Sequence, residues 1–224
     1  MSFIKIFNLY KEVGDIHREI KDEIKDLYLV DMKASELIYH IEQKILEKTK
    51  QKNIIGINNC LGFPIGISVN NCCAHWTISS KLDDIVFKDN DLVKIDFGIN
   101  NKGFIVDSAL TIATNKEHDL HEQLNNASQE ALYSAIKMAR PDTIISEIGA
   151  QTHEIIESYG FNPVNALCGH KIMPFKIHAD KVIPNIKFNF YNKRIEENEI
   201  YAIEPFVSNK SGNSYMAENE NTHY

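Results

Sequence analysis

The sequence has little of what marks a secreted or membrane-spanning protein. Its 224 residues include only four cysteines and one tryptophan, and no apolar run approaches the length needed to cross a membrane. The first residues, Met1 to Phe7, contain neither a cationic leader nor a small-residue cleavage site. We therefore expect a soluble, cytoplasmic protein whose thiols are reduced.

A basic surface is lacking as well. Lys and Arg number 24 against 31 Asp and Glu, which gives a formal net charge of −7 and a pI near 5.7. This balance argues against nucleic acid, or an anionic membrane, as a partner of the chain as a whole. A small substrate or a peptide fits the composition better.

Several familiar motifs are incomplete or missing. The pairs His121-Glu122 and His153-Glu154 both lack the second histidine of the H-E-x-x-H metalloprotease helix. The chain has no phosphate-binding loop and no dinucleotide fingerprint. A zinc site built from cysteine and histidine is an alternative, but adjacent cysteines lack the usual gap between structural zinc ligands. Its ligands would be Cys60, Cys72, Cys73 and His75.

Apolar residues at a three-and-four spacing predict four helices. In the second of them, the predicted inward stripe ends with Ile45 and Leu46. Arg140-Pro141 stops the third helix, and Gly160 caps the fourth. The predicted helices are Leu9 to Leu27, Ser35 to Lys48, Glu117 to Ala139 and Ser146 to Tyr159.

The rest of the chain shows short strands punctuated by Gly, Pro and Asn. No linker, repeat or low-complexity segment divides it, so we predict one domain, residues 1–224, with N-terminal helices over about 1–50 and a polar tail over 208–224. The expected class is α+β, which mixes antiparallel strands with helices.

Two aspartates stand on neighbouring alternating segments, Val93 to Gly98 and Gly103 to Ser108. A hairpin centred between Asn101 and Lys102 would pair Asp96 with Asp107. Directly opposite carboxylates about 5 Å apart repel each other, and a divalent cation between them would relieve the repulsion. One protonated carboxylate, or a bulged register, is the alternative.

Four further short sequence motifs complete a pattern with these aspartates. They are Gly62 to Gly66, Asn70 to Trp76, Gly169 to Ile172 and Tyr201 to Glu204. In order and spacing they resemble the type II methionine aminopeptidases. The resemblance implies a pita-bread fold, an antiparallel sheet flanked by helices, here without the type II helical insertion and the last strands. It also implies removal of the initiator methionine from nascent peptide N-termini.

The resemblance further implies a paired metal site. Its ligands here would be Asp96, Asp107, His170 and Glu204, and two divalent ions, Co, Mn, Fe or Zn, suit such oxygen and imidazole donors. A metal-activated water would attack the peptide. Glu204 would also shuttle a proton from that water to the leaving amine. The remaining family ligand, a glutamate, has no counterpart here unless Glu218 or Glu220 replaces it.

Other residues match substrate-binding positions of the family. His75 and His178 would contact the substrate backbone and help to stabilise charge in the transition state. An apolar slot for the methionine side chain would include Phe63, Pro64 and Ile177. His223 matches a further pocket histidine with an offset of one residue.

Two alternatives accompany this interpretation. A proline-directed relative of the same fold would release Xaa from Xaa-Pro peptides. An inactive or truncated pita-bread relative would act as a binding module. Sheet edges left open by the missing strands would also favour self-association with a second chain.

Overall fold

The structure is a computed structural model that describes residues 2–54, 60–78 and 84–216. These residues form two compact units, the first within Met1–Lys116 and the second within Glu117–Tyr215. The single domain expected from the sequence stays a prediction. No helix among the described residues is long and apolar enough to span a membrane.

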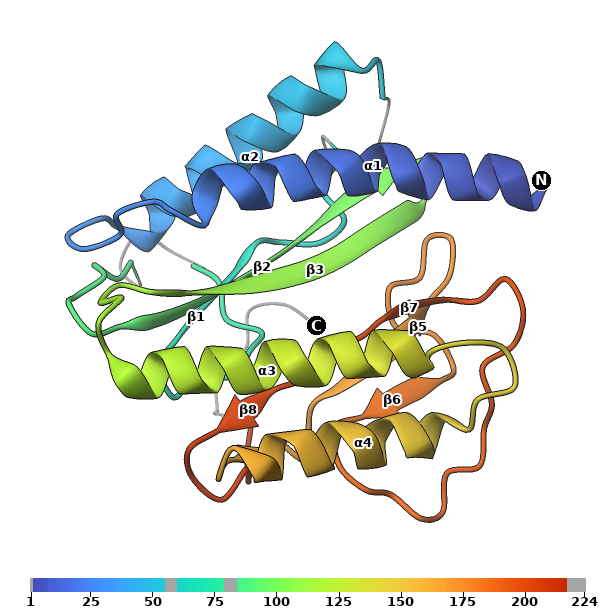
Figure 1. The fold of residues 1–224 in the computed structure, drawn as a ribbon. Coiled ribbons are helices and arrows are strands. Elements are labelled where there is room, and N and C mark those ends of the chain that lie inside the picture. The colour runs from blue at the N-terminus through green and yellow to red at the C-terminus, as the bar shows by residue number, and fades with distance from the viewer. Residues whose placement is uncertain (1, 55–59, 79–83, 217–224) are drawn as a thin grey trace. The chain divides into compact units, whose positions relative to one another are not determined.

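The first unit consists of two helices and a three-stranded antiparallel sheet (Figure 1). Strand β2 (Leu92–Asn101) is the middle strand, between β1 (Gly66–Val69) and β3 (Phe104–Ala113). Helix α1 (Phe3–Ile24) lies along β2 and β3, and α2 (Ala34–Gln51) packs against α1. Alternation of apolar residues sends one face of the sheet into this core. The buried apolar side chains of β2 are Val93, Ile95, Phe97 and Ile99.

The first two predicted helices are confirmed, with shifted ends. Helix α1 starts earlier than Leu9 and ends at Ile24, because Lys25 caps it and the chain then turns. Helix α2 begins at Ala34, where the Glu36 carboxylate accepts a hydrogen bond of 3.1 Å from the Lys33 backbone N–H. Leu46 is 41% exposed, so its predicted place in the apolar stripe is wrong.

The second unit contains two helices and short strands. Helices α3 (Asp119–Met138) and α4 (Ile145–Ser158) pack side by side (Figure 1). Strand β5 (Cys168–Ile172) is the middle of a three-stranded sheet, between β6 (Val182–Pro184) and β7 (Ile200–Ala202). Strands β4 (Asn162–Pro163) and β8 (Val207–Ser208) pair separately. The predicted cap at Gly160 is confirmed by its φ of 78°.

The β2–β3 hairpin corrects the predicted register. Asn101 pairs with Phe104, so the turn is only Lys102 and Gly103, whose φ angles are 55° and 92°. Positive φ at both turn residues is the requirement of a type I′ hairpin. Asn101 stays in the ladder because it is buried and its side-chain amide donates to Glu12 at 3.2 Å.

The prediction that Asp96 and Asp107 lie directly opposite each other is therefore wrong. Asp107 pairs with Gly98, and Asp96 pairs with Ala109. Paired residues share a face of the sheet, as do residues two apart on one strand. The two aspartates still lie on one face, as diagonal neighbours, and that face is opposite to the one covered by α1.

Candidate metal centre

On their face of the first sheet, the two aspartates are paired with small residues. Around Asp96 the directly paired neighbours are Gly66 on β1 and Ala109 on β3, and Asp107 is paired with Gly98. The Oδ1 atom of Asp96 is buried, although the residue as a whole is half-buried. Both aspartates thus have small residues as their directly paired neighbours.

Phe63 lies on this same face. A Cβ added to Gly98 would stand 2.5 Å from Cε1 of Phe63, so the ring occupies the place where a side chain at position 98 would project. The Gly62 backbone N–H donates to the Gly98 carbonyl at 2.8 Å and ties this segment to β2. An apolar ring predicted to line a pocket thus lies against Gly98, the residue paired with Asp107.

The other predicted residues of the first unit lie around β1. Pro64 is exposed and directly precedes the buried Ile65. His75 is half-buried and has a φ of 64°, and the next residue, Trp76, accepts a backbone hydrogen bond of 2.8 Å from Ile67 on β1. The alternative zinc site is not formed, because no cluster of three ligand side chains within residues 2–54, 60–78 and 84–216 contains Cys60, Cys72, Cys73 or His75.

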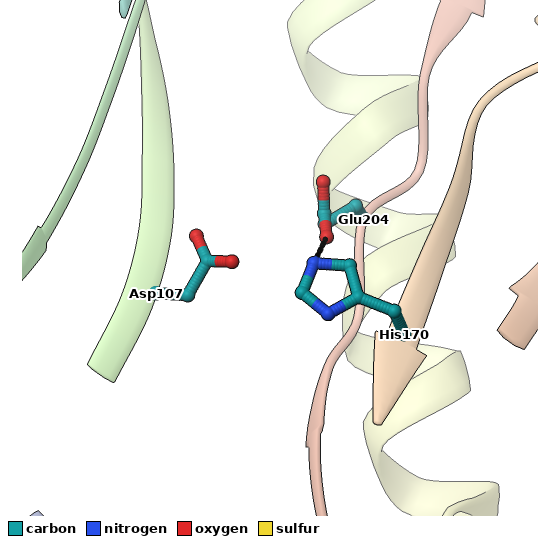
Figure 2. A group of neighbouring side chains, drawn as sticks. All are labelled: Asp107, His170 and Glu204. Carbon is teal, nitrogen blue, oxygen red and sulfur yellow. Dashed lines mark ion pairs between the residues drawn. The ribbon is translucent and has the colours of Figure 1, made fainter. Parts of the chain in front are cut away.

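In the second unit the buried His170 pairs with the half-buried Glu204. Nε2 of His170 lies 3.0 Å from Oε1 of Glu204, and the His170 side chain is only 7% exposed. Figure 2 shows this pair as a dashed line, and it also draws Asp107 on β3. His170 is on β5 and pairs with Ala202 of β7, so Glu204, two residues beyond Ala202, follows on the same side.

Glycine is required directly before His170. A Cβ at position 169 would lie 2.4 Å from the backbone oxygen of Ala202, which is closer than any side chain can approach. The Gly169-His170 dipeptide therefore reflects the tight pairing of β5 with β7. This close contact sets the distance between the His170 strand and the segment that carries Glu204.

His178 lies beside this pair. Its ring stands edge-on to the ring of His170, with centroids 4.3 Å apart and an interplanar angle of 88°. The neighbouring Ile177 is half-buried.

Burial, together with the nearby Glu204 carboxylate, raises the pKa of the Cys168 thiol, so this cysteine stays protonated and is a poor metal ligand. His223, Glu218 and Glu220 lie outside the described residues.

Comparison with known proteins shows the family. The model of the family described as Metallopeptidase family M24 matches residues 8–224. The chain belongs to metallopeptidase family M24.

Relatives of this M24 chain include methionine aminopeptidases. One from Thermococcus onnurineus is 36% identical over 201 residues, which cover 90% of this chain and 64% of the relative. Methionine aminopeptidase 2 of Saccharomyces cerevisiae is 34% identical over 232 residues, which cover 97% of this chain and 53% of the relative. The chain thus spans about half to two thirds of the length of these relatives.

A solved structure agrees with the sequence relatives. The methionine aminopeptidase of Thermotoga maritima superposes with a TM-score of 0.79 at 25% identity and covers 95% of this chain and 84% of its own. The fold of this M24 metallopeptidase is therefore the predicted pita-bread fold, α+β with antiparallel sheets flanked by helices.

The donor atoms fit the metals expected of an M24 metallopeptidase. Carboxylate oxygens and imidazole nitrogens together suit Mn, Fe, Co and Zn. A half-buried carboxylate facing a buried imidazole, as in the His170–Glu204 pair, is a preorganised pair of such donors. In the first unit, Asp96 and Asp107 share one face of a sheet. The described residues therefore suit divalent cations.

Sequence reasoning missed one group behind the His170–Glu204 pair. Glu199 precedes β7 and contacts both Lys171 and Lys181, and none of these three residues was assigned a role. The available signal was weak: Glu199 and Tyr201 are two residues apart on an alternating segment, and Lys171 is adjacent to His170.

Proposed function

We propose that this chain is a metal-dependent aminopeptidase that removes the initiator methionine from the N-termini of nascent proteins. The observation that supports it most directly is the contact of the buried His170 with Glu204 in a member of a metallopeptidase family. The curated relatives named methionine aminopeptidases suggest the substrate. An apolar ring on the aspartate face, Phe63, agrees with a methionine-binding slot.

The proposed ligands of two divalent ions are Asp96, Asp107, His170 and Glu204. When bound, such ions lower the pKa of a water molecule and polarise the scissile carbonyl. Each ligand sits on, or next to, a strand of an antiparallel sheet, so its backbone is held by a hydrogen-bonded ladder. Rigid placement of donors is what a catalytic metal site requires.

Glu204 is the proposed proton carrier. Its carboxylate would accept a proton from the attacking water and deliver it to the amine that leaves. The 3.0 Å contact between its Oε1 and His170 Nε2 restrains the carboxylate.

The two further histidines would bind the substrate backbone. His178 stacks edge-on against His170, so its ring is held beside the proposed ligand. A neutral ring N–H at this place can donate a hydrogen bond to the carbonyl oxygen as negative charge develops there. His75 is assigned the same kind of contact. Phe63, Pro64 and Ile177 would supply apolar surface for the methionine side chain.

The test is release of methionine from the peptide Met-Ala-Ser with Mn²⁺ or Co²⁺ added to the metal-free chain. We expect release by the wild type and none by His170→Ala. His153→Ala is the matched control, because His153 is a partly buried histidine of the same unit that pairs with Glu157 at 3.2 Å and has no proposed role. Absence of release with every metal would reject the proposal for this chain.

The alternatives have distinct outcomes in the same assay. Absence of saturable Mn²⁺ uptake in calorimetry, together with no release of any amino acid, would support a binding module that lacks the metal site. Cleavage of Xaa-Pro peptides, with Met-Ala-Ser left intact, would support the proline-directed relative. Asp96→Asn and Asp107→Asn test the contribution of the first unit, and each is expected to lower Mn²⁺ affinity by about tenfold or more.

A further inference from the structure

Glu199 is an unusually enclosed carboxylate of the second unit. Its side chain is only 8% exposed, and its Oε1 lies 2.8 Å from Lys171 Nζ and 2.8 Å from Lys181 Nζ. The two lysine side chains are themselves 17% and 7% exposed. Two ammonium groups and the carboxylate between them are thus withdrawn from water, and such an arrangement is retained only where its geometry is good.

The other oxygen of Glu199 is equally occupied. Oε2 accepts hydrogen bonds from the Tyr201 hydroxyl at 2.7 Å, the Glu196 backbone N–H at 2.8 Å and Lys181 Nζ at 2.9 Å. Burial alone would raise the pKa of Glu199, but the hydrogen bonds from Lys171 and Lys181 outweigh burial and lower the pKa to about 2. Glu199 is therefore ionised throughout the physiological pH range.

These contacts connect all three strands of one sheet. Lys171 is on the middle strand β5, Lys181 directly precedes β6, and Tyr201 is on β7. Lys171 pairs with Tyr201 in the ladder, and the adjacent His170 pairs with Ala202. Because side chains alternate along a strand, Lys171 and Tyr201 project to one face and His170 to the other. Glu199 joins the strands on the face opposite to His170.

We propose that Glu199 is a positioning residue that fixes β7 to β5 and thereby holds Glu204 in place against His170. This inference rests on the proposed function only in that it takes these two residues as metal ligands. The segment from Glu199 to Glu204 contains six residues, and the Glu199 contacts hold its first end. Its other end carries the carboxylate that meets His170.

Loss of the Glu199 charge should disturb this arrangement while the shape is kept. In Glu199→Gln the side chain has nearly the same volume, but the two enclosed ammonium groups lose their one enclosed counter-charge and keep only the exposed carboxylates of Asp180 and Glu196. One of the carboxylate oxygens is also replaced by an NH₂ group, which cannot accept a hydrogen bond. We expect β7 to shift relative to β5 so that the two ammonium groups regain water.

Mn²⁺ titration calorimetry on the full chain measures the effect on the metal site. Glu199→Gln is expected to weaken Mn²⁺ binding about 10- to 100-fold, the range found when groups that orient metal ligands are removed. Glu196→Gln is the matched control: Glu196 contacts the same Lys181 at 2.7 Å, but its side chain is 73% exposed. For that variant we expect a change within about twofold.

A second readout needs no metal. The imidazole ¹⁵N resonances of His170 in the metal-free chain report its contact with Glu204, and His170→Ala assigns them. We expect these resonances to move in Glu199→Gln and to stay in place in Glu196→Gln. If the wild type fails to bind Mn²⁺, the proposed function fails, while the resonances still decide the role of Glu199.

Thermal unfolding separates positioning from simple stabilisation. A lower unfolding temperature for Glu199→Gln, with wild-type His170 resonances and Mn²⁺ affinity in the folded range, would overturn the inference. If Glu199→Gln does not fold, Tyr201→Phe removes a single donor to Oε2 and keeps every charge. That variant should shift the His170 resonances in the same direction by a smaller amount, and no shift would likewise overturn the inference.

Discussion

The two units place their proposed metal ligands by different physical means. In the first unit, β2 and β3 are ten-residue strands whose apolar face packs on α1 and α2. In the second, β5, β6 and β7 have five, three and three residues. There a close backbone contact at Gly169 and the enclosed ions around Glu199 take the place of a long ladder.

This difference determines what each unit tolerates. A long strand with a buried apolar face sets the direction of every side chain on it, because a slip of one residue would expose the whole core face. Short strands carry too few apolar residues for this. Their register depends on a few specific contacts, so one substitution in the second unit should matter more than a similar one in the first.

Gly169→Ala is expected to have the largest effect. The new Cβ would meet the Ala202 backbone oxygen at 2.4 Å, and backbone held in a ladder cannot move aside. We expect a loss of at least about 3 kcal/mol in the free energy of unfolding of the second unit, measured by urea denaturation. In the first unit, Gly98→Ala meets only the ring of Phe63, which can turn, and should cost about 1–2 kcal/mol.

Gly14→Ala provides the control for these two substitutions. It lies within α1, and its nearest neighbour would be a Val106 methyl group at 4.0 Å. Removal of a helical glycine should stabilise the chain by about 0.5–1 kcal/mol. Equal losses for Gly169→Ala and Gly98→Ala would contradict the difference drawn between the units.

Acid should open the first unit before the second. His17 on α1 is buried, stacks on Phe97 and donates from Nε2 to the Phe97 carbonyl at 2.7 Å. Burial lowers the pKa of His17 to about 4, although this hydrogen bond and the Asp107 charge act in the opposite direction. The contribution of His17 is complete above its unfolded pKa of 6.5 and is lost as the pH falls towards 4.

As the pH falls from 7 to 5, protonation of His17 in the unfolded chain should lower the free energy of unfolding by about 2 kcal/mol. This value follows from a His17 pKa of about 4 in the folded chain and 6.5 in the unfolded chain. Glu199 behaves differently: its lowered pKa makes its contribution complete above 4.5 and lost only as the pH falls towards 2. Hydrogen-exchange protection of β2 and β5 at both pH values checks the contrast. In His17→Gln the extra sensitivity of β2 should disappear, and its persistence would assign the effect to another group.

Much of the fold is encoded in local patterns, which is why it was predictable. The four long helices and the β2–β3 pair follow from apolar periodicity, since burial of one face requires it. Helix ends moved by a few residues because caps such as Lys33 with Glu36 depend on hydrogen bonds rather than on periodicity. Leu46 fits the helical spacing but lies at the edge of the buried stripe, where no neighbouring element covers it.

The candidate site was only partly predictable from the residues themselves. Asp96 and Asp107 were found on neighbouring strands, and their common face follows from alternation. His170 and Glu204 came from resemblance to a family, because 34 positions separate them and no local rule pairs them. Glu199 was missed for the same reason. Its ion pairs are with residues 28 and 18 positions earlier in the sequence, and pairs this far apart produce no periodic sequence pattern.

The smallest expected effect concerns the turn that shifted the hairpin register. Lys102 has a φ of 55°, a conformation that lysine adopts only with strain, whereas asparagine followed by glycine is the preferred type I′ pair. Lys102→Asn should therefore stabilise the first unit by up to about 0.5 kcal/mol, measured by urea denaturation. Lys102 is exposed, and neither its removal nor the loss of its charge should disturb other contacts. A destabilised variant would mean that the chain does not turn at Lys102 and Gly103, and Asp107 would then no longer be paired with Gly98.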